Sequence, residues 1–249
     1  MAGRIPDSPF VLLDDARASH AAPARLYRDP LEVVTATDAV SLHALLDRLA
    51  AEGGHWAGFL TYEAGLLLED RLAARVAPAA LPLAWFGRFD GFEEIAADQV
   101  ADLLPSPEGG WAGAPRPLIA RPDYDAALAR VQALIAAGDI YQANLTIRAE
   151  VSTAGHPLAL YAGLRARAKA GFGGVIWTGQ DWMLSLSPEL FFALHDGAGV
   201  NAGSVGHASG ERWHRRPSAS RLSTARRSRR STNSPATNPA LGTSSPRAT

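Results

Sequence analysis

The chain has 249 residues, of which 47% are hydrophobic, enough for one large or two small globular domains. It contains no cysteine, which excludes disulfides and thiolate chemistry, and its first residues, MAGRIPDSPF, lack the apolar run of a signal peptide. No stretch approaches the ~20 apolar residues of a membrane span, so we expect a cytoplasmic protein.

The net charge of -1 conceals two parts of opposite sign. Residues 201–249 hold nine Arg and one acid, Glu211, a net charge of +8, whereas residues 1–200 carry -9. The basic part is rich in Ser, Thr, Pro and Ala and shows no helical or strand period, which predicts a disordered tail. Such a tail can bind phosphates, but no aromatic residue follows Trp213 to stack on bases, so nucleic-acid binding is not expected.

An N-terminal lobe with its linker is expected over residues 1–117. One helical face of LHALLDRLAAEGG carries four leucines, and the Gly pair is a normal helix stop: Leu42, Leu45, Leu46 and Leu49. HWAGFLTYEAG predicts a strand from Trp56 to Tyr62, and PLAWFGRFDGFEEI predicts another strand region. The Pro- and Gly-rich run at residues 105–117 is typical of a linker or a long loop.

A second part is expected over residues 118–200. Asp123 can cap a helix that Gly138 ends, with apolar residues at three- and four-residue spacing: Tyr124, Leu128, Val131, Leu134 and Ile135. A strand GDIYQANLT, a helix near LALYAGLRARAKAG and a hairpin of GGVIWTG and WMLSLS with a turn at Gln180 and Asp181 follow, then SPELFFALHDG. This order predicts an α+β fold with mainly antiparallel pairing.

The expected strand after Gly138 has two unlike faces. Its apolar face would carry Tyr141, Ala143, Leu145 and Ile147. Its other face would carry Gln142, Asn144, Thr146 and Arg148, three of them uncharged hydrogen-bonding groups. Taken alone, these residues favour a polar face in contact with water. A ligand cleft is the other interpretation.

Nucleotide and zinc chemistry find no support in the sequence. There is no phosphate-cradling Gly loop, and the seven His are scattered without partners at metal-ligand spacing. We therefore predict no metal-binding residue in this chain.

Two motifs resemble those of the chorismate-utilising enzymes. They are YDAALARVQALIAAGDIYQANLTIR and LSLSPELFF, and QANLT is most similar to the aminodeoxychorismate synthase component I (para-aminobenzoate synthase component I) branch. The segments FVLLDD, WAGFLTYEAG and PLAWFGRF are similar to the first lobe of that branch, so the resemblance covers roughly residues 8 to 200. It implies an incomplete antiparallel β-sheet sandwich with flanking helices.

The resemblance gives the uncharged face a role. In the family this strand lies in the substrate cleft, which implies that Gln142, Asn144 and Thr146 face the substrate. Isochorismate and salicylate synthases place a Lys at the position of Gln142, where it activates water. A Gln cannot act as a base, so amination by ammonia is favoured over addition of water.

Glu189 and Ser187 in SPELFF form the second candidate pair. In the family the matching Glu is a general acid that protonates the departing C4 hydroxyl of chorismate, a role that contributes ~10²- to 10⁴-fold. The alternative is that Ser187 and Glu189 hold a turn before the next strand.

Other family features are missing from this sequence. In the aminodeoxychorismate branch a Lys about sixteen residues after this Glu attacks the substrate covalently, but position 205 is Val and the chain's one Lys is Lys169. The family's Mg²⁺-binding glutamates would lie further downstream. The abrupt change in composition near residue 200 suggests a frameshift that removes this part of the enzyme.

The resulting hypothesis is an inactive, C-terminally shortened aminodeoxychorismate synthase component I. The intact relative would convert chorismate to 4-amino-4-deoxychorismate for folate synthesis, with Mg²⁺ and with ammonia from a glutamine amidotransferase subunit. The alternatives are an anthranilate synthase component I and a remnant that binds a partner subunit without catalysis. Asp14 and Asp15 depart from the inhibitor-binding element of related anthranilate synthases, so feedback inhibition is not expected.

Overall fold

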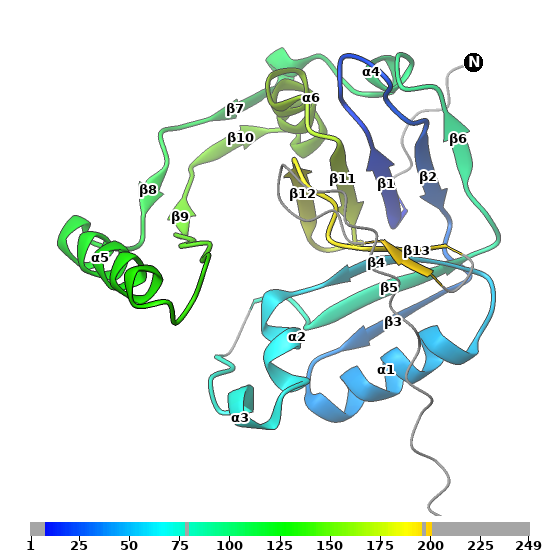
Figure 1. The fold of residues 1–249 in the computed structure, drawn as a ribbon. Coiled ribbons are helices and arrows are strands. Elements are labelled where there is room, and N and C mark those ends of the chain that lie inside the picture. The colour runs from blue at the N-terminus through cyan, green and yellow to red at the C-terminus, as the bar shows by residue number, and fades with distance from the viewer. Residues whose placement is uncertain (1–7, 78–79, 196–197, 201–249) are drawn as a thin grey trace, which may run out of the picture.

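The computed structural model describes residues 8–77, 80–195 and 198–200, and shows helices and mainly antiparallel strands (Figure 1). Its largest sheet has five strands in the order β12-β11-β1-β2-β6, every neighbouring pair being antiparallel. The strands are β1 Phe10–Asp14, β2 Ala24–Arg28, β6 Glu93–Ile95, β11 Phe172–Trp177 and β12 Trp182–Ser187. This arrangement is compatible with the expected α+β class.

The first strand of the chain pairs with a strand from its second part. Phe10 lies opposite Trp177 and Asp14 lies opposite Gly173, so every residue of β1 pairs with β11. The helices α6 Pro157–Ala168 and α4 Val100–Leu103 contribute to the core that this sheet buries. The sheet thus takes strands from both sides of residue 117, and the division into domains there stays a prediction.

A second sheet has the order β3-β5-β4 and packs against α1. The elements are β3 Glu32–Ala36, α1 Ala39–Ala51, β4 His55–Leu60 and β5 Ala84–Phe89. Asp38 begins α1 because its side chain accepts a hydrogen bond from the Ser41 backbone N–H at 2.8 Å. Leu42 and Leu45 are buried, as the leucine spacing predicts.

The two sheets meet through an apolar cluster. Val11 and Tyr27 come from the five-stranded sheet, and Trp85 and Phe89 come from the three-stranded sheet. Because strand side chains alternate between faces, each sheet can bury one face here and the other under helices. The strand predicted to reach Tyr62 ends at Leu60. Thr61 instead caps the short helix α2 Tyr62–Leu67, and α3 Asp70–Ala73 follows it.

Residues 110–155 form an arm that extends away from both sheets (Figure 1). Two short strand pairs build it: β7 Gly110–Ala112 with β10 Thr153–Gly155, and β8 Arg116–Pro117 with β9 Ala149–Glu150. The helix α5 Arg121–Ala137 lies at its end, and none of its residues is buried. The predicted linker therefore contains β7, β8 and a 3-10 turn, Pro107–Gly109.

The ends of α5 show where local sequence signals were right. Gly138 ends the helix in the left-handed region, with φ 79°, as its position predicts. The start was misplaced: Ala120 is the N-cap, Pro122 lies in the first turn, and Asp123 is an acidic residue within that turn. Pro fits this place because the first helical N–H groups have no partner inside the helix.

The strand predicted over GDIYQANLT is wrong. Residues 140–148 have no regular secondary structure, and pairing begins at Ala149. A strand is stable when a neighbouring strand accepts its backbone hydrogen bonds, and no described strand lies beside this part of the arm. Apolar and polar side chains do alternate here, but alternation in the sequence does not show whether a neighbouring strand is present to pair with this segment.

The hairpin after α6 was predicted correctly. β11 pairs with β12 from Phe172 opposite Ser187 to Trp177 opposite Trp182. The expected turn is held by Thr178, whose hydroxyl oxygen accepts from the Asp181 N–H at 2.8 Å. A further pair, β13 Ala193–His195 with β14 Ala198–Val200, follows. The predictions for the basic tail and for Val205 concern residues 201–249, which lie outside the described residues.

Candidate functional site

A pocket of about 730 Å³ lies where the two sheets approach each other. It is walled by the end of β1, the start of β2, three residues of β4, and parts of β11 and β12. Its apolar surface includes Phe59, Phe172, Met183 and Leu190. A pocket of this size, apolar with a few charged groups, suits a small organic molecule.

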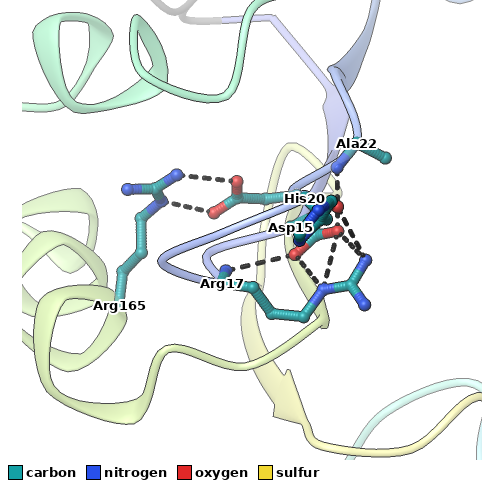
Figure 2. A network of polar contacts seen from close by, with 6 residues as sticks. Asp15, Arg17, His20, Ala22 and Arg165 are labelled. Atoms are coloured by element: carbon teal, nitrogen blue, oxygen red, sulfur yellow. Dashed lines mark hydrogen bonds and ion pairs between the residues drawn. The ribbon is translucent and has the colours of Figure 1, made fainter.

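Asp15 and Arg17 form one polar side of the pocket (Figure 2). Arg17 donates to the buried Asp15 carboxylate through Nη2 at 2.5 Å and through Nε at 2.9 Å. The Ala22 N–H donates to the same carboxylate at 2.9 Å. These bonds outweigh burial and lower the pKa of Asp15 to about 2, so the carboxylate is charged and fully engaged at neutral pH.

Asp14 points away from Asp15, as neighbouring strand residues do. Its carboxylate accepts from Arg165 Nε at 2.6 Å and from the Tyr161 hydroxyl at 2.9 Å, and its side chain is fully buried. Burial, followed by the Asp14 charge, raises the pKa of Tyr161 well above its usual value. This network joins β1 to α6 and engages both oxygens of the Asp14 carboxylate.

Arg25 is the group in the pocket that can bind an anion. Its guanidinium lies over the Phe92 ring at 4.9 Å from the centroid, and within the described part of the chain no carboxylate forms an ion pair with it. An arginine beside apolar walls can hold a ligand carboxylate. The arrangement can therefore bind a small molecule, but it places no general acid beside it.

Sequence reasoning did not find this pocket as a site. Its walls come from β1, β2, β4, β11 and β12, which are far apart in the chain, and no motif marks Arg25. The signal that could have located it is the pair of acids Asp14 and Asp15 at the end of an apolar strand. Acids in a buried position need cationic or hydrogen-bonding partners nearby.

Three predicted site residues lie on the arm and outside the pocket lining: Gln142, Asn144 and Thr146. All three are exposed, and the Thr146 hydroxyl donates to the Asn144 carbonyl oxygen at 3.4 Å. Just after them, Arg148 forms an ion pair of 2.7 Å with Glu63, a contact between the arm and the helix α2.

Of the other two predicted residues, Ser187 is the last residue of β12 and Glu189 lies in the bend that follows it. The Ser187 hydroxyl donates to the Glu189 carbonyl oxygen at 2.8 Å and accepts from the Glu189 N–H at 3.3 Å. These are the bonds of the turn interpretation. The structure thus joins Ser187 to Glu189, but no contact joins them to Gln142, and the convergence of the two groups on one substrate surface stays a prediction.

No group of three His, Asp or Glu side chains that could hold a metal occurs among the residues the structure describes. These residues do not fit the Mg²⁺ that the resemblance implies, and we derive no step through it. Within the same residues, no helix is both long enough and apolar enough to cross a membrane.

The amino-acid sequence matches the model of a known protein family. The sequence model of the family described as chorismate binding enzyme matches residues 9–201, which is more than half of the chain. A search of curated proteins found no match.

Proposed function

Because the chain belongs to the chorismate-binding enzyme family, we propose that it derives from the branch that aminates chorismate to 4-amino-4-deoxychorismate. In this proposal it resembles component I of aminodeoxychorismate synthase, a cytoplasmic enzyme of para-aminobenzoate and folate synthesis. A glutamine amidotransferase subunit would supply the ammonia. The observation that carries the proposal is Gln142 in the QANLT motif.

Gln142 supports amination because its side chain cannot act as a base. A carboxamide does not accept a proton near neutral pH, so it cannot activate water as a Lys at this position can. It can still donate and accept hydrogen bonds. Gln142 is exposed and makes no side-chain hydrogen bond to another described residue, so its amide can orient a ligand.

Glu189 is proposed as the general acid for the C4 hydroxyl. Ser187 fixes the backbone of its turn, and no described cation forms an ion pair with its carboxylate. A general acid gives its proton to the leaving oxygen as the C–O bond breaks, so its carboxyl must be protonated when substrate is bound, which burial favours. Glu189 is exposed here, so the role requires the cleft to close over it.

The route through a covalent lysine is not open to this chain as given. Its one lysine, Lys169, precedes Glu189 and caps the C-terminus of α6 in the left-handed region, with φ 48°. We therefore propose that the 249-residue chain forms no aminodeoxychorismate at a useful rate, even with saturating ammonia and Mg²⁺.

The second candidate is an anthranilate synthase component I, a branch that does not use the covalent amine; the segment that would distinguish the two branches is missing from this sequence. A third possibility, a remnant that binds the amidotransferase subunit without catalysis, is compatible with the same observation. The three differ in product and in partner binding.

One experiment separates the three candidates. Chorismate, Mg²⁺ and ammonium are supplied to the chain and to a version whose reading frame is restored near codon 200, and the products are separated by chromatography. We expect aminodeoxychorismate from the restored version alone, and ~10²- to 10⁴-fold less of it after Glu189→Gln. The exposed Glu108→Gln is the matched control and should retain activity.

The outcomes are distinct. Anthranilate from either version would replace the proposal with the second candidate. Equal turnover by the two versions would refute the inactivity of the chain as given. Capture of the amidotransferase subunit without any product would favour the remnant.

A further inference from the structure

We propose that the chain associates with a second copy of itself by strand addition. In this proposal, residues 140–147 on the arm of one copy pair with the outer edge of β12 in the other. The proposal does not depend on which reaction the chain catalyses.

The arm segment has the composition of a strand that lacks its partner. Residues 140–147, IYQANLTI, contain no charged residue, no Pro and no Gly, and they alternate apolar and polar side chains. Tyr141 is 92% exposed and Ile147 is 45% exposed. Uncharged segments of this length and β-propensity readily pair with other strands.

The backbone of the segment is unpaired as well. Asp139 donates to the Leu134 carbonyl oxygen at 3.0 Å, and Leu118 donates to the Arg148 carbonyl oxygen at 2.8 Å. Between these anchors, no backbone group of residues 140–147 bonds to another backbone group in the described part of the chain. An added strand would satisfy this row of donors and acceptors through backbone bonds.

β12 offers an edge with which the arm segment can pair. This strand ends the five-stranded sheet, and its six residues, WMLSLS, carry no charge. The opposite edge, β6, has three residues, of which Glu93 and Glu94 are acidic. Short length and charge are the usual protection of an edge, and β12 has neither.

The edges of the three-stranded sheet are less suitable. On β3, Glu32 is held by ion pairs with Arg48 and Arg88, which places charges at that edge. On β4, the consecutive residues Gly58, Phe59 and Leu60 all line the pocket. Three consecutive residues cannot all point to one face of a strand, so the pocket touches the backbone of β4 as well as its side chains.

β12 differs from β4 in this respect. Its pocket residues, Met183 and Ser185, alternate along the strand and therefore share one face. Among the residues that the structure describes, no strand pairs with the outer edge of β12, which can therefore accept one.

The occupant is a second copy because the arm is held away from its own β12. The strand pairs β7–β10 and β8–β9 set the direction of the arm, and an ion pair of Arg148 with Glu63 adds a contact to α2. Figure 1 shows the segment beside α5 at the end of the arm, apart from β12. Two copies related by a two-fold axis can each place an arm on the other's sheet without changing either arm.

The mass of the full chain in solution tests the proposal. Light scattering should give twice the chain mass of 26.3 kDa. Ser185→Lys, which places a charge on the edge strand, and Asn144→Pro, which removes a backbone donor from the segment, should each return the mass of one chain. Gln180→Lys adds the same charge in the hairpin turn and should keep the double mass. A single-chain mass for the unmodified protein would overturn the proposal.

Disulfide trapping identifies the contact, and it is possible because the chain has no cysteine. Chains with one Cys placed in turn at residues 142 to 146 are mixed with a Ser185→Cys chain and oxidised. At least one position should give a disulfide-linked pair of unlike chains. The same chains mixed with Glu94→Cys, on the opposite edge, should not.

Three trapping results would contradict the proposal. Arm cysteines that link to each other would indicate arm-to-arm pairing. A doubly substituted chain that closes its own disulfide as a single chain would show that the arm reaches its own β12. Linkage to Glu94→Cys in place of Ser185→Cys would place the contact at β6.

Discussion

Arg165 of α6 donates from Nε to Oδ2 of Asp14 at 2.6 Å, although the two residues are 151 positions apart in the chain. The Asp14 side chain is fully buried, and that of Arg165 is 14% exposed. The Tyr161 hydroxyl shares the same carboxylate. This pair fixes α6 on the end of β1, next to the pocket.

Asp14→Asn should therefore strongly destabilise the fold. Breaking a buried ion pair leaves the Arg165 charge uncompensated, which costs about 3–5 kcal/mol. Urea unfolding followed by circular dichroism measures this loss. Asp125→Asn breaks the exposed pair with Arg121 and should cost less than about 0.5 kcal/mol. Equal losses in the two variants would show that the buried network does not hold α6 in place.

Asp15 should make stability depend on acid pH. Its pKa falls from 3.8 in the unfolded chain to about 2 in the folded protein, so its contribution is complete above the unfolded pKa. The contribution is then lost as the pH falls through the folded pKa, between about pH 5 and pH 1. Because Arg17 is half exposed, we expect about 1–2 kcal/mol at neutral pH.

The measurement compares the parent with Asp15→Asn by urea unfolding at pH 6 and at pH 2. The difference between them should be clear at pH 6 and should shrink at pH 2. A difference that stays constant, or that grows toward acid pH, would contradict the lowered pKa.

Gly58→Ala should destabilise the three-stranded sheet. A Cβ at Gly58 would lie 2.0 Å from the Trp85 carbonyl oxygen and 2.7 Å from the Phe86 Cα, both backbone atoms of β5. The strands must separate locally, at a cost of about 1–3 kcal/mol. A Cβ at Gly65 in α2 would have no atom within 4 Å. Gly65→Ala should therefore stabilise the folded protein by about 0.5–1 kcal/mol, because Ala favours a helix more than Gly does. Thermal unfolding of the two variants should show shifts of opposite sign.

Gln142→Lys tests the chemistry of the arm in the frame-restored version described above. A lysine can activate water, so aminodeoxychorismate should decrease and an isomer of chorismate should appear, in which water has added to the ring as the C4 hydroxyl left; chromatography resolves the two products. Gln132→Lys, on the exposed surface of α5, is the control and should leave the products unchanged. Unaltered amination by Gln142→Lys would show that residue 142 does not decide between water and ammonia.

The sequence by itself determined the elements whose signals are local. Four leucines and a Gly pair located α1, and a left-handed glycine located the end of α5 at Gly138. The turn of the β11–β12 hairpin followed from neighbouring residues, whereas the bonds between Ser187 and Glu189 match the alternative interpretation of this pair. Such signals act over a few residues, so periodicity and capping suffice to read them.

The tertiary structure alone decided what these elements meet. It paired β1 with β11, placed Arg165 on Asp14, and assembled the pocket from strands distant in the chain. It also left residues 140–148 without a strand, although their side chains alternate as a strand requires. The alternation of apolar and polar side chains predicts only that the two faces of a strand would differ. A strand also needs a neighbour for its backbone hydrogen bonds, and that neighbour is a property of the whole fold.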